Sequence, residues 1–147
     1  MKKLSENRLK HSYAVAQKCY VLAKEHGMSE DDAKAAFVMG LLHDIGYAAE
    51  EGGVSAHTYT GADMVQCLVN HHQEIIDAIS GHGIGDLDTM FALVLNEADM
   101  TTGVRGTDVS YDERIHGIEV RYGKDSIQAQ NAREMREKLD NAWAGNG

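Results

Sequence analysis

Histidines and aspartates recur in this sequence at positions where a helical pattern calls for apolar side chains. His11 begins the apolar stripe of the first predicted helix, while His57 and His82 share faces with aliphatic residues of later segments. Asp44 and Asp99 likewise lie on helix faces whose preceding residues, about one and two turns before them, are mainly apolar. A buried carboxylate is costly unless it is paired or bound to a cation. Several inward imidazoles and carboxylates are most simply satisfied by a metal ion.

The distribution of charge along the chain also favours a cation site. No lysine or arginine occurs between Lys34 and Arg105, although this span contains ten acidic residues and five histidines. Because neither Asp44 nor Asp99 has a basic neighbour in sequence, only a distant segment or a metal ion can neutralise them. Imidazoles and carboxylates without basic side chains suit a cation better than an anion.

The adjacent pair His43-Asp44 stands at the predicted end of a helix. Neighbouring helical residues point about 100° apart, but at a helix end both side chains can approach one cation from different sides, while Gly46 lets the backbone turn away. The alternative is a helix-terminal histidine beside a solvated aspartate. For His11 and Asp99 the alternative is a hydrogen-bonded core histidine and a buried carboxylate paired with an arginine.

The elements that must position these residues are all helical. Ser5 and Ser29 look like N-caps, Gly27 looks like a C-terminal cap, and no alternating β pattern occurs. The fold class is therefore all-α. The predicted helices cover residues 5–26, 29–46, 57–68, 75–82, 91–99, 111–122 and 125–144, with loops near 47–56 and 103–110. We expect one domain over residues 1–144 and a frayed tail over 145–147.

Composition excludes several classes of protein. Among the 147 residues, 43% are hydrophobic and no apolar run has the length of a membrane span, so we expect no membrane association. The N-terminus lacks the apolar core of a signal peptide, which predicts a cytoplasmic protein. A net charge of −9 disfavours nonspecific binding to nucleic acid, which needs a basic surface. We therefore expect no nucleic-acid partner.

The order His, His-Asp, Asp resembles the signature of the HD superfamily of metal-dependent phosphohydrolases. Here it reads His11, His43-Asp44 and Asp99, and residues 43–46 spell the HDIG variant. Residues 11–105 are also similar to HD-type dinucleoside tetraphosphate hydrolases. The segments that carry this similarity are His57-x-x-x-Gly61-Ala62, Ile75-Ile76-Asp77-Ala78-Ile79 leading to His82, and Glu97-Ala98-Asp99. The ordered set is more specific than the His-Asp dipeptide alone.

The resemblance implies a compact bundle of about six to seven helices and one or two divalent transition-metal ions. The first metal would be held by His11, His43, Asp44 and Asp99. A second metal would be bridged by Asp44 and held also by His57 and His82, although both histidines adjoin glycine-rich segments and can equally be solvated. Nitrogen and oxygen ligands fit Fe, Mn, Co, Ni or Zn, and the presence of only two cysteines excludes a thiolate-rich zinc site.

The implied activity is hydrolysis of a phosphoester or phosphoanhydride by a metal-activated water. The expected partner is a small phosphorylated molecule, most simply a nucleotide. The residues expected to act in catalysis are Asp44, His57, His82 and Arg105. Arg105 follows Asp99 closely and would contact phosphate, whereas Tyr47 stands where many HD enzymes carry a phosphate-binding lysine. The alternative is a non-catalytic module that keeps the metal and binds or senses a nucleotide.

Overall fold

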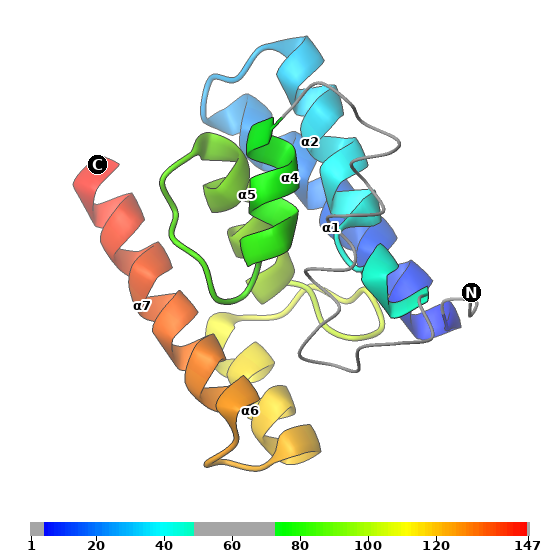
Figure 1. Cartoon of the computed structure of the whole chain (residues 1–147), viewed down its shortest axis with the longest axis vertical. Coiled ribbons are helices and arrows are strands. Elements are labelled where there is room, and N and C mark those ends of the chain that lie inside the picture. The colour runs from blue at the N-terminus through cyan, green and yellow to red at the C-terminus, as the bar shows by residue number, and fades with distance from the viewer. Residues whose placement is uncertain (1–4, 49–72, 147) are drawn as a thin grey trace.

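The computed structural model describes residues 5–48 and 73–146, and the regular secondary structure in these ranges is helical (Figure 1). The helices are α1 (Glu6–Glu25), α2 (Glu30–Leu42), the 3₁₀ helix η1 (Ile45–Ala48), α4 (Gln73–Gly81), α5 (Met90–Met100), α6 (Tyr111–Tyr122) and α7 (Ile127–Asn146). The described residues contain no strand, only one isolated antiparallel bridge between Thr102 and Asp108. The prediction of an all-α protein is confirmed.

Side-chain caps explain where most of these helices begin. The N-cap hydroxyls that accept a hydrogen bond from the third helical amide belong to Ser5, Ser29, Thr89 and Ser110. At α6 the bond is reciprocal, because the Glu113 side chain accepts from the backbone amide of Ser110. Such caps satisfy amides that have no partner inside the helix.

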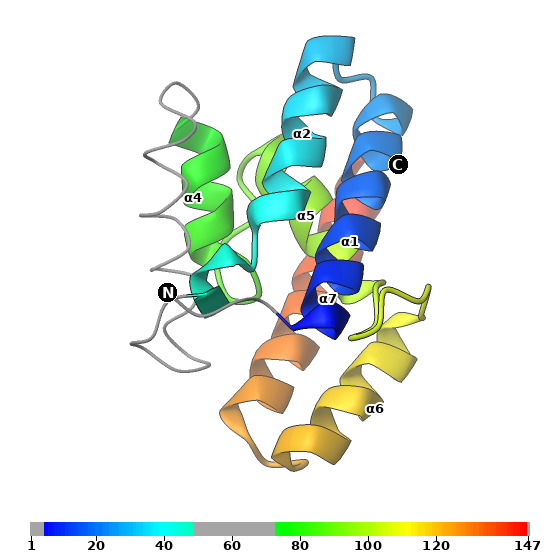
Figure 2. The same cartoon turned by 90° about the vertical axis from the view of Figure 1, so that its right-hand side faces the viewer.

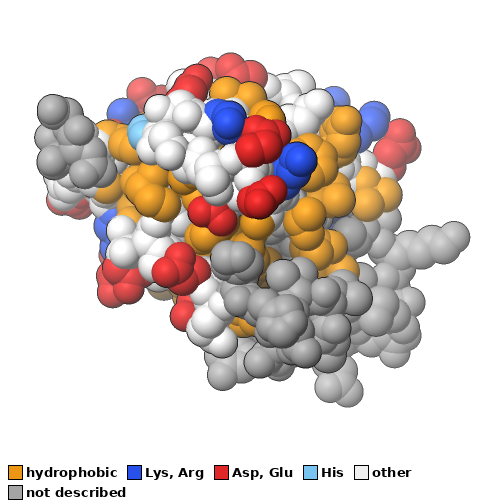
Figure 3. All heavy atoms as spheres, turned by 90° about the horizontal axis from the view of Figure 1, so that it is seen from above, with side chains coloured by type: hydrophobic (Ala, Val, Ile, Leu, Met, Phe, Trp, Pro, Cys, Tyr) orange, Lys and Arg blue, Asp and Glu red, His pale blue; other side chains and the backbone are white. Residues whose placement is uncertain are grey.

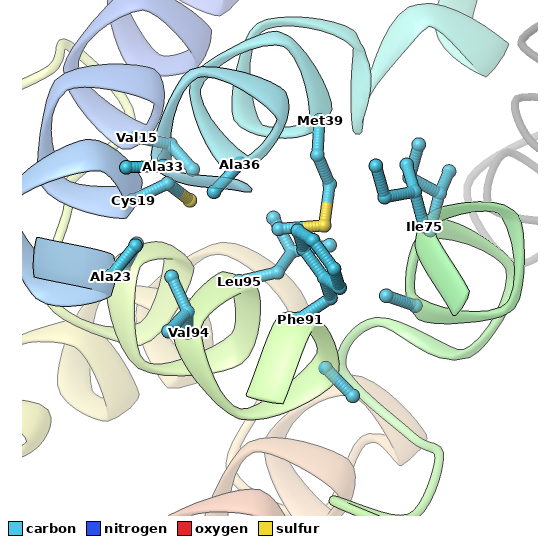
Figure 4. Packing of buried hydrophobic residues seen from close by; sticks show 14 of the residues in the cluster. Val15, Cys19, Ala23, Ala33, Ala36, Met39, Ile75, Phe91, Val94 and Leu95 are labelled. Carbon is cyan, nitrogen blue, oxygen red and sulfur yellow. The ribbon is translucent and has the colours of Figure 1, made fainter. Parts of the chain in front are cut away.

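The main core lies between α1, α2, α4 and α5. Met39 of α2, Ile75 of α4, and Phe91 and Leu95 of α5 all lie in this cluster and are nearly or fully buried (Figure 4). The helices α1 and α2 run side by side (Figure 2), and Gly40 lets their backbones approach closely at Ala16. This core fixes the relative positions of the four helices that carry the site residues.

A second apolar cluster joins α6 and α7 to the opposite face of α5. Leu93 of α5, Ile115 of α6, and Met135 and Leu139 of α7 are its principal buried residues. In Figure 1, α7 runs along one edge of the molecule and α6 crosses below α5. The segment between α5 and α6 is thereby held against the N-terminal half of α1, where the Gly103 carbonyl meets the His11 ring.

Several predicted boundaries differ from the structure. The second predicted helix runs to residue 46, but α2 ends at Leu42 and the 3₁₀ helix η1 (Ile45–Ala48) follows, partly within the predicted loop. The last helix begins at Ile127 because the Ser126 hydroxyl accepts from the Ala129 amide, as an N-cap does. It ends at Asn146, so Gly145 and Asn146 continue the helix instead of fraying, and only the last residue lies outside the described range. The predicted helix over 57–68 also lies outside the described residues. Within the described part of the chain, every helix is too short or too polar to cross a membrane.

Candidate metal centre

Four helices bring five of the predicted residues together. His11 lies on α1, His43 caps the C-terminus of α2 with Asp44 directly after it, His82 follows α4, and Asp99 lies near the end of α5. His43 is completely buried, and at most 7% of the surface of His11, Asp44 and His82 is exposed. Their ligand atoms form two overlapping groups, His11–His43–Asp99 and His43–Asp44–His82, each within 4.8 Å. Sequence positions up to 88 residues apart therefore converge at one point.

All three imidazoles are oriented in the same way. His11 Nδ1 donates to the Gly103 carbonyl at 2.8 Å, a contact between residues 92 positions apart. The Nδ1 atoms of His43 and His82 donate to carbonyls three residues earlier, Gly40 at 2.6 Å and Ile79 at 2.7 Å. A carbonyl can only accept, so each Nδ1 carries a proton, and in the neutral form of each ring Nε2 has a lone pair. This tautomer is the one that metal-binding histidines adopt when a backbone carbonyl holds the other nitrogen.

The three Nε2 atoms face two carboxylates. His11 Nε2 lies 2.8 Å and His43 Nε2 3.3 Å from Oδ1 of Asp99. Asp44 contacts both groups, because its Oδ2 lies 3.4 Å from His43 Nε2 and its Oδ1 lies 3.3 Å from His82 Nε2. Asp44 and His43 thus connect the two groups.

The charges in this centre are strongly coupled. Burial alone would lower the pKa of His43, but the nearby carboxylates of Asp44 and Asp99 outweigh it and raise that pKa to about 9. Burial alone would raise the pKa of Asp99, but the nearby imidazoles of His11 and His43 and the charge of Arg114 hold it well below the usual range. The Asp99 carboxylate therefore stays ionised and favours a positive partner.

The donor set fits a divalent cation. His43 Nε2 is buried without a well-formed hydrogen bond, which is costly for a polar atom unless another partner uses its lone pair. Ligands bonded at about 2.1 Å around one ion lie about 3 to 3.5 Å apart, and most of the Nε2-to-carboxylate distances are close to that range. Nitrogen and oxygen donors of this kind suit Fe, Mn, Co, Ni or Zn.

Arg114 reaches the same centre, which the sequence did not reveal. It lies on α6, is mostly buried, and places its Nη2 atom 3.6 Å from Asp99 Oδ1. The alternative for Asp99, a carboxylate paired with an arginine, is therefore correct for one of its contacts, although Asp99 also faces two imidazoles. The only signal in the sequence is that Arg114 directly precedes the buried Ile115 in an amphipathic helix.

The remaining expected site residues have different positions. Arg105 lies on the surface segment after α5 and is exposed, so its side chain is not among the groups that surround the metal centre. His57 lies outside the described residues. Tyr47 belongs by its backbone to η1, and the structure does not describe its side chain.

Comparison with known proteins places the chain in a family. The family model for the HD domain matches residues 8–116. Proteins named Ribonuclease Y are similar to the chain. The one from Lawsonia intracellularis is 32% identical over 92% of this chain, and the one from Oleidesulfovibrio alaskensis is 38% identical over 69% of it. These matches cover only 28% and 19% of the two relatives. No solved structure matches the chain significantly.

The comparisons bear on two expectations from the sequence, the exclusion of nucleic acid as a partner and the resemblance to the HD superfamily. The name of these relatives denotes enzymes that act on RNA, so they do not support the expectation, drawn from net charge, that nucleic acid is excluded as a partner. The family match includes His11, the His43-Asp44 pair and Asp99. By this match the chain belongs to the HD-domain family, within the superfamily of metal-dependent phosphohydrolases, as its ordered histidines and aspartates predict.

Proposed function

We propose that this chain hydrolyses a phosphoester bond in a nucleotide or a short oligonucleotide with the help of one or two divalent transition-metal ions. The observation that carries the proposal is the shared orientation of the three imidazoles. Each Nδ1 proton is bound by a backbone carbonyl, so three Nε2 atoms and two carboxylates face one another in a buried space. A structural cluster of hydrogen-bonded histidines would give the buried His43 Nε2 atom a well-formed hydrogen bond, whereas here it lies 3.4 Å and 3.3 Å from two carboxylate oxygens without one.

Each residue has a proposed role. A bound divalent ion lowers the pKa of a coordinated water and stabilises negative charge on phosphoryl oxygens. His11, His43, Asp44 and Asp99 would hold the first ion. Asp44 and His82, together with His57 from outside the described residues, would hold a second ion.

Arg114 is placed to act on the substrate as well. Its guanidinium group, close to Asp99, offers several N–H donors in a planar arrangement that matches phosphate oxygens. Arg114 would thereby supply a positive charge beside the metals, whereas Tyr47, which stands where many HD enzymes carry a lysine, carries none. Arg105 would contact phosphate from the outer edge of the same region.

The substrate is expected to be small. At the end of the molecule that carries the turn between α1 and α2, acidic and basic side chains are interspersed with apolar patches (Figure 3). A net charge of −9 leaves little basic surface for a long polyanion. The ribonuclease relatives favour a phosphodiester as the bond attacked, and the charge distribution favours a nucleotide or a few linked nucleotides over a long strand.

The test is metal analysis followed by hydrolysis assays with an Asp44→Asn variant. Purified wild type should contain about one or two transition-metal ions per chain and should hydrolyse a phosphoester from a panel of nucleotides and dinucleotides. A metal at about 100 times its dissociation constant should add about 2.7 kcal/mol to the free energy of unfolding. Asp44→Asn should lose most of the metal, most of this stabilisation and at least about 100-fold of the activity.

Asp125→Asn is the matched control, because Asp125 is exposed and lies in the turn before α7, far along the chain from every proposed ligand. It should retain metal and activity. Full metal content and full activity in Asp44→Asn would refute the proposal. Tight nucleotide binding by the metal-loaded wild type with no turnover under any metal would instead establish the alternative of a non-catalytic binding module.

A further inference from the structure

A pocket adjoins the metal centre and lies between α6 and the segment that follows α5. It has a volume of about 210 Å³ and is lined on one side by Arg114 and Arg121 of α6 and on the other by Arg105. Two of its lining residues also belong to the metal centre, because Gly103 accepts from the His11 ring and Arg114 contacts Asp99. Gly103 and Arg114 therefore border both the metal centre and this pocket.

The two arginines of α6 lie along one face of the helix. Arg114 and Arg121 are seven residues apart, which is about two turns, and Gly117 lies between them without a side chain to fill the space. A Cβ atom at Gly117 would lie 3.3 Å from Nη1 of Arg121, so the Arg121 guanidinium group lies back over Gly117 towards Arg114. The side of the pocket that α6 forms is thus bordered by the side chains of Arg114 and Arg121.

Of the three arginines that line the pocket, only Arg114 has a carboxylate in contact, that of Asp99. Among the described residues no carboxylate forms an ion pair with Arg105 or Arg121. Glu113 also lines the pocket and brings one negative charge, with its carboxylate accepting from the Ser110 amide in the capping box. Burial, followed by the charges of Arg114 and Arg8, lowers the pKa of Arg121, which shows that like charges lie within range of one another.

Three arginines and one glutamate give the pocket lining a net positive charge, although the chain as a whole carries a net charge of −9. The position of this positive charge beside a candidate phosphohydrolase centre suggests an anionic ligand. An ordinary surface arginine extends its side chain into solvent. Arg121 does so in part, and its Cζ atom lies 5.9 Å from the centre of the Tyr122 ring. That arrangement does not account for three arginines lining the same pocket.

We propose that the pocket formed by Arg105, Arg114 and Arg121 binds a second phosphate of the substrate, next to the phosphate that reacts at the metals. This inference rests on the proposed function and narrows it to substrates with at least two phosphates. Guanidinium groups bind phosphate oxygens through paired N–H donors. The second phosphate can be the next phosphodiester of an oligonucleotide or the terminal phosphate of a nucleoside diphosphate.

The test compares substrates that carry one and two phosphates in an Arg121→Gln variant of the full chain. The one-phosphate substrate is the p-nitrophenyl ester of thymidine 5′-monophosphate. The two-phosphate substrates are a 5′-phosphorylated dinucleotide and ADP. For the two-phosphate substrate that the wild type uses, Arg121→Gln should raise KM by about tenfold or more with little change in kcat. KM for the one-phosphate ester should not change.

Arg105→Gln should show the same pattern, and Arg133→Gln is the matched control. Arg133 lies on α7 with its exposed side chain paired to Glu119, away from the pocket. It should leave KM unchanged for all substrates. If the dinucleotide alone responds, the second phosphate belongs to a nucleotide chain, and if ADP alone responds, it is a terminal phosphate. An equal response of one-phosphate and two-phosphate substrates, or no response of either, would overturn the proposal.

A binding measurement separates failure of this inference from failure of the proposed function. Pyrophosphate binding to wild type and Arg121→Gln is measured by calorimetry in EDTA, with circular dichroism to confirm that both are folded. Binding that weakens by about tenfold in Arg121→Gln supports the pocket even if no substrate is hydrolysed. Hydrolysis that continues normally, together with pyrophosphate binding that Arg121→Gln does not weaken, refutes the pocket and leaves the proposed function intact.

Discussion

Replacing Gly40 by alanine tests the closest contact between two helices that carry histidines of the metal centre. A Cβ atom at Gly40 of α2 would lie 2.7 Å from the Cα and 2.9 Å from the amide nitrogen of Ala16 on α1, and 3.1 Å from the Cys19 sulfur. Non-bonded carbon atoms prefer separations of about 3.5 to 4.0 Å. Because two of these contacts are backbone atoms, α1 and α2 must move apart by about an ångström. His11 and His43 would separate with them.

The magnitude follows from two opposing effects. Overpacking a close-packed core costs about 1 to 3 kcal/mol, and the upper end applies here because backbone must shift. Alanine in place of glycine inside a helix recovers about 1 kcal/mol. We therefore expect a net loss of about 2 kcal/mol in the free energy of unfolding, which lowers the urea midpoint by about 1 M at a slope of about 2 kcal/mol per molar urea.

The assay is urea unfolding, followed by metal titration of the folded variant. Gly81→Ala is the control, because Gly81 ends α4 and a Cβ atom there meets nothing within 4 Å. We expect Gly81→Ala to keep or slightly raise stability, and Gly40→Ala to lose stability and bind metal more weakly, since the Gly40 carbonyl also orients the His43 ring. If both substitutions have the same effect, the close approach of α1 and α2 does not determine stability, and the reasoning is wrong.

Two further predictions concern residues near the centre. Burial, with a smaller contribution from Asp99, raises the pKa of the Cys19 thiol. In a Cys67→Ser variant, Cys19 should therefore resist iodoacetamide in native buffer at mildly alkaline pH and react fully in denaturing urea, and rapid native labelling would contradict its burial. The ammonium group of Lys18 lowers the pKa of Asp108 from its ordinary 3.8, so this pair stabilises the fold above that pH and ceases to do so as the pH falls through the lowered value. Asp108→Asn should speed hydrogen exchange of the Val109 amide at neutral pH but not at strongly acidic pH, and a difference that persisted in acid would exclude the ion pair as its cause.

Several helix boundaries can be predicted from sequence because local side chains determine them. The helix over Tyr111–Tyr122 has the expected ends, since Ser110 and Glu113 form a capping box that requires no distant contact. The last helix begins two residues later than predicted because Ser126, and not the acidic residue before it, supplies the cap. Such differences arise where two neighbouring polar residues can each begin a helix.

The positions of the candidate ligands are also partly local. His11, Asp44, His82 and Asp99 stand out because polar groups interrupt apolar faces, and all four lie at the candidate metal centre. Arg114 does not stand out in this way, because an arginine at the edge of an apolar stripe is common on exposed helix faces. Its contact with Asp99 depends on how α6 packs against the end of α5.

The sequence by itself determined the helical class, most helix ends and the identity of the candidate donor atoms, because periodicity and caps act within a few residues. Only the tertiary structure decided the orientation of His11, whose ring is held by a carbonyl 92 residues away, and the contact of Arg114 with Asp99. It also brought Arg105 and Arg121 to the walls of one pocket. These contacts depend on how the helices pack against one another. That packing follows from the fit of many side chains together and not from any local pattern in the sequence.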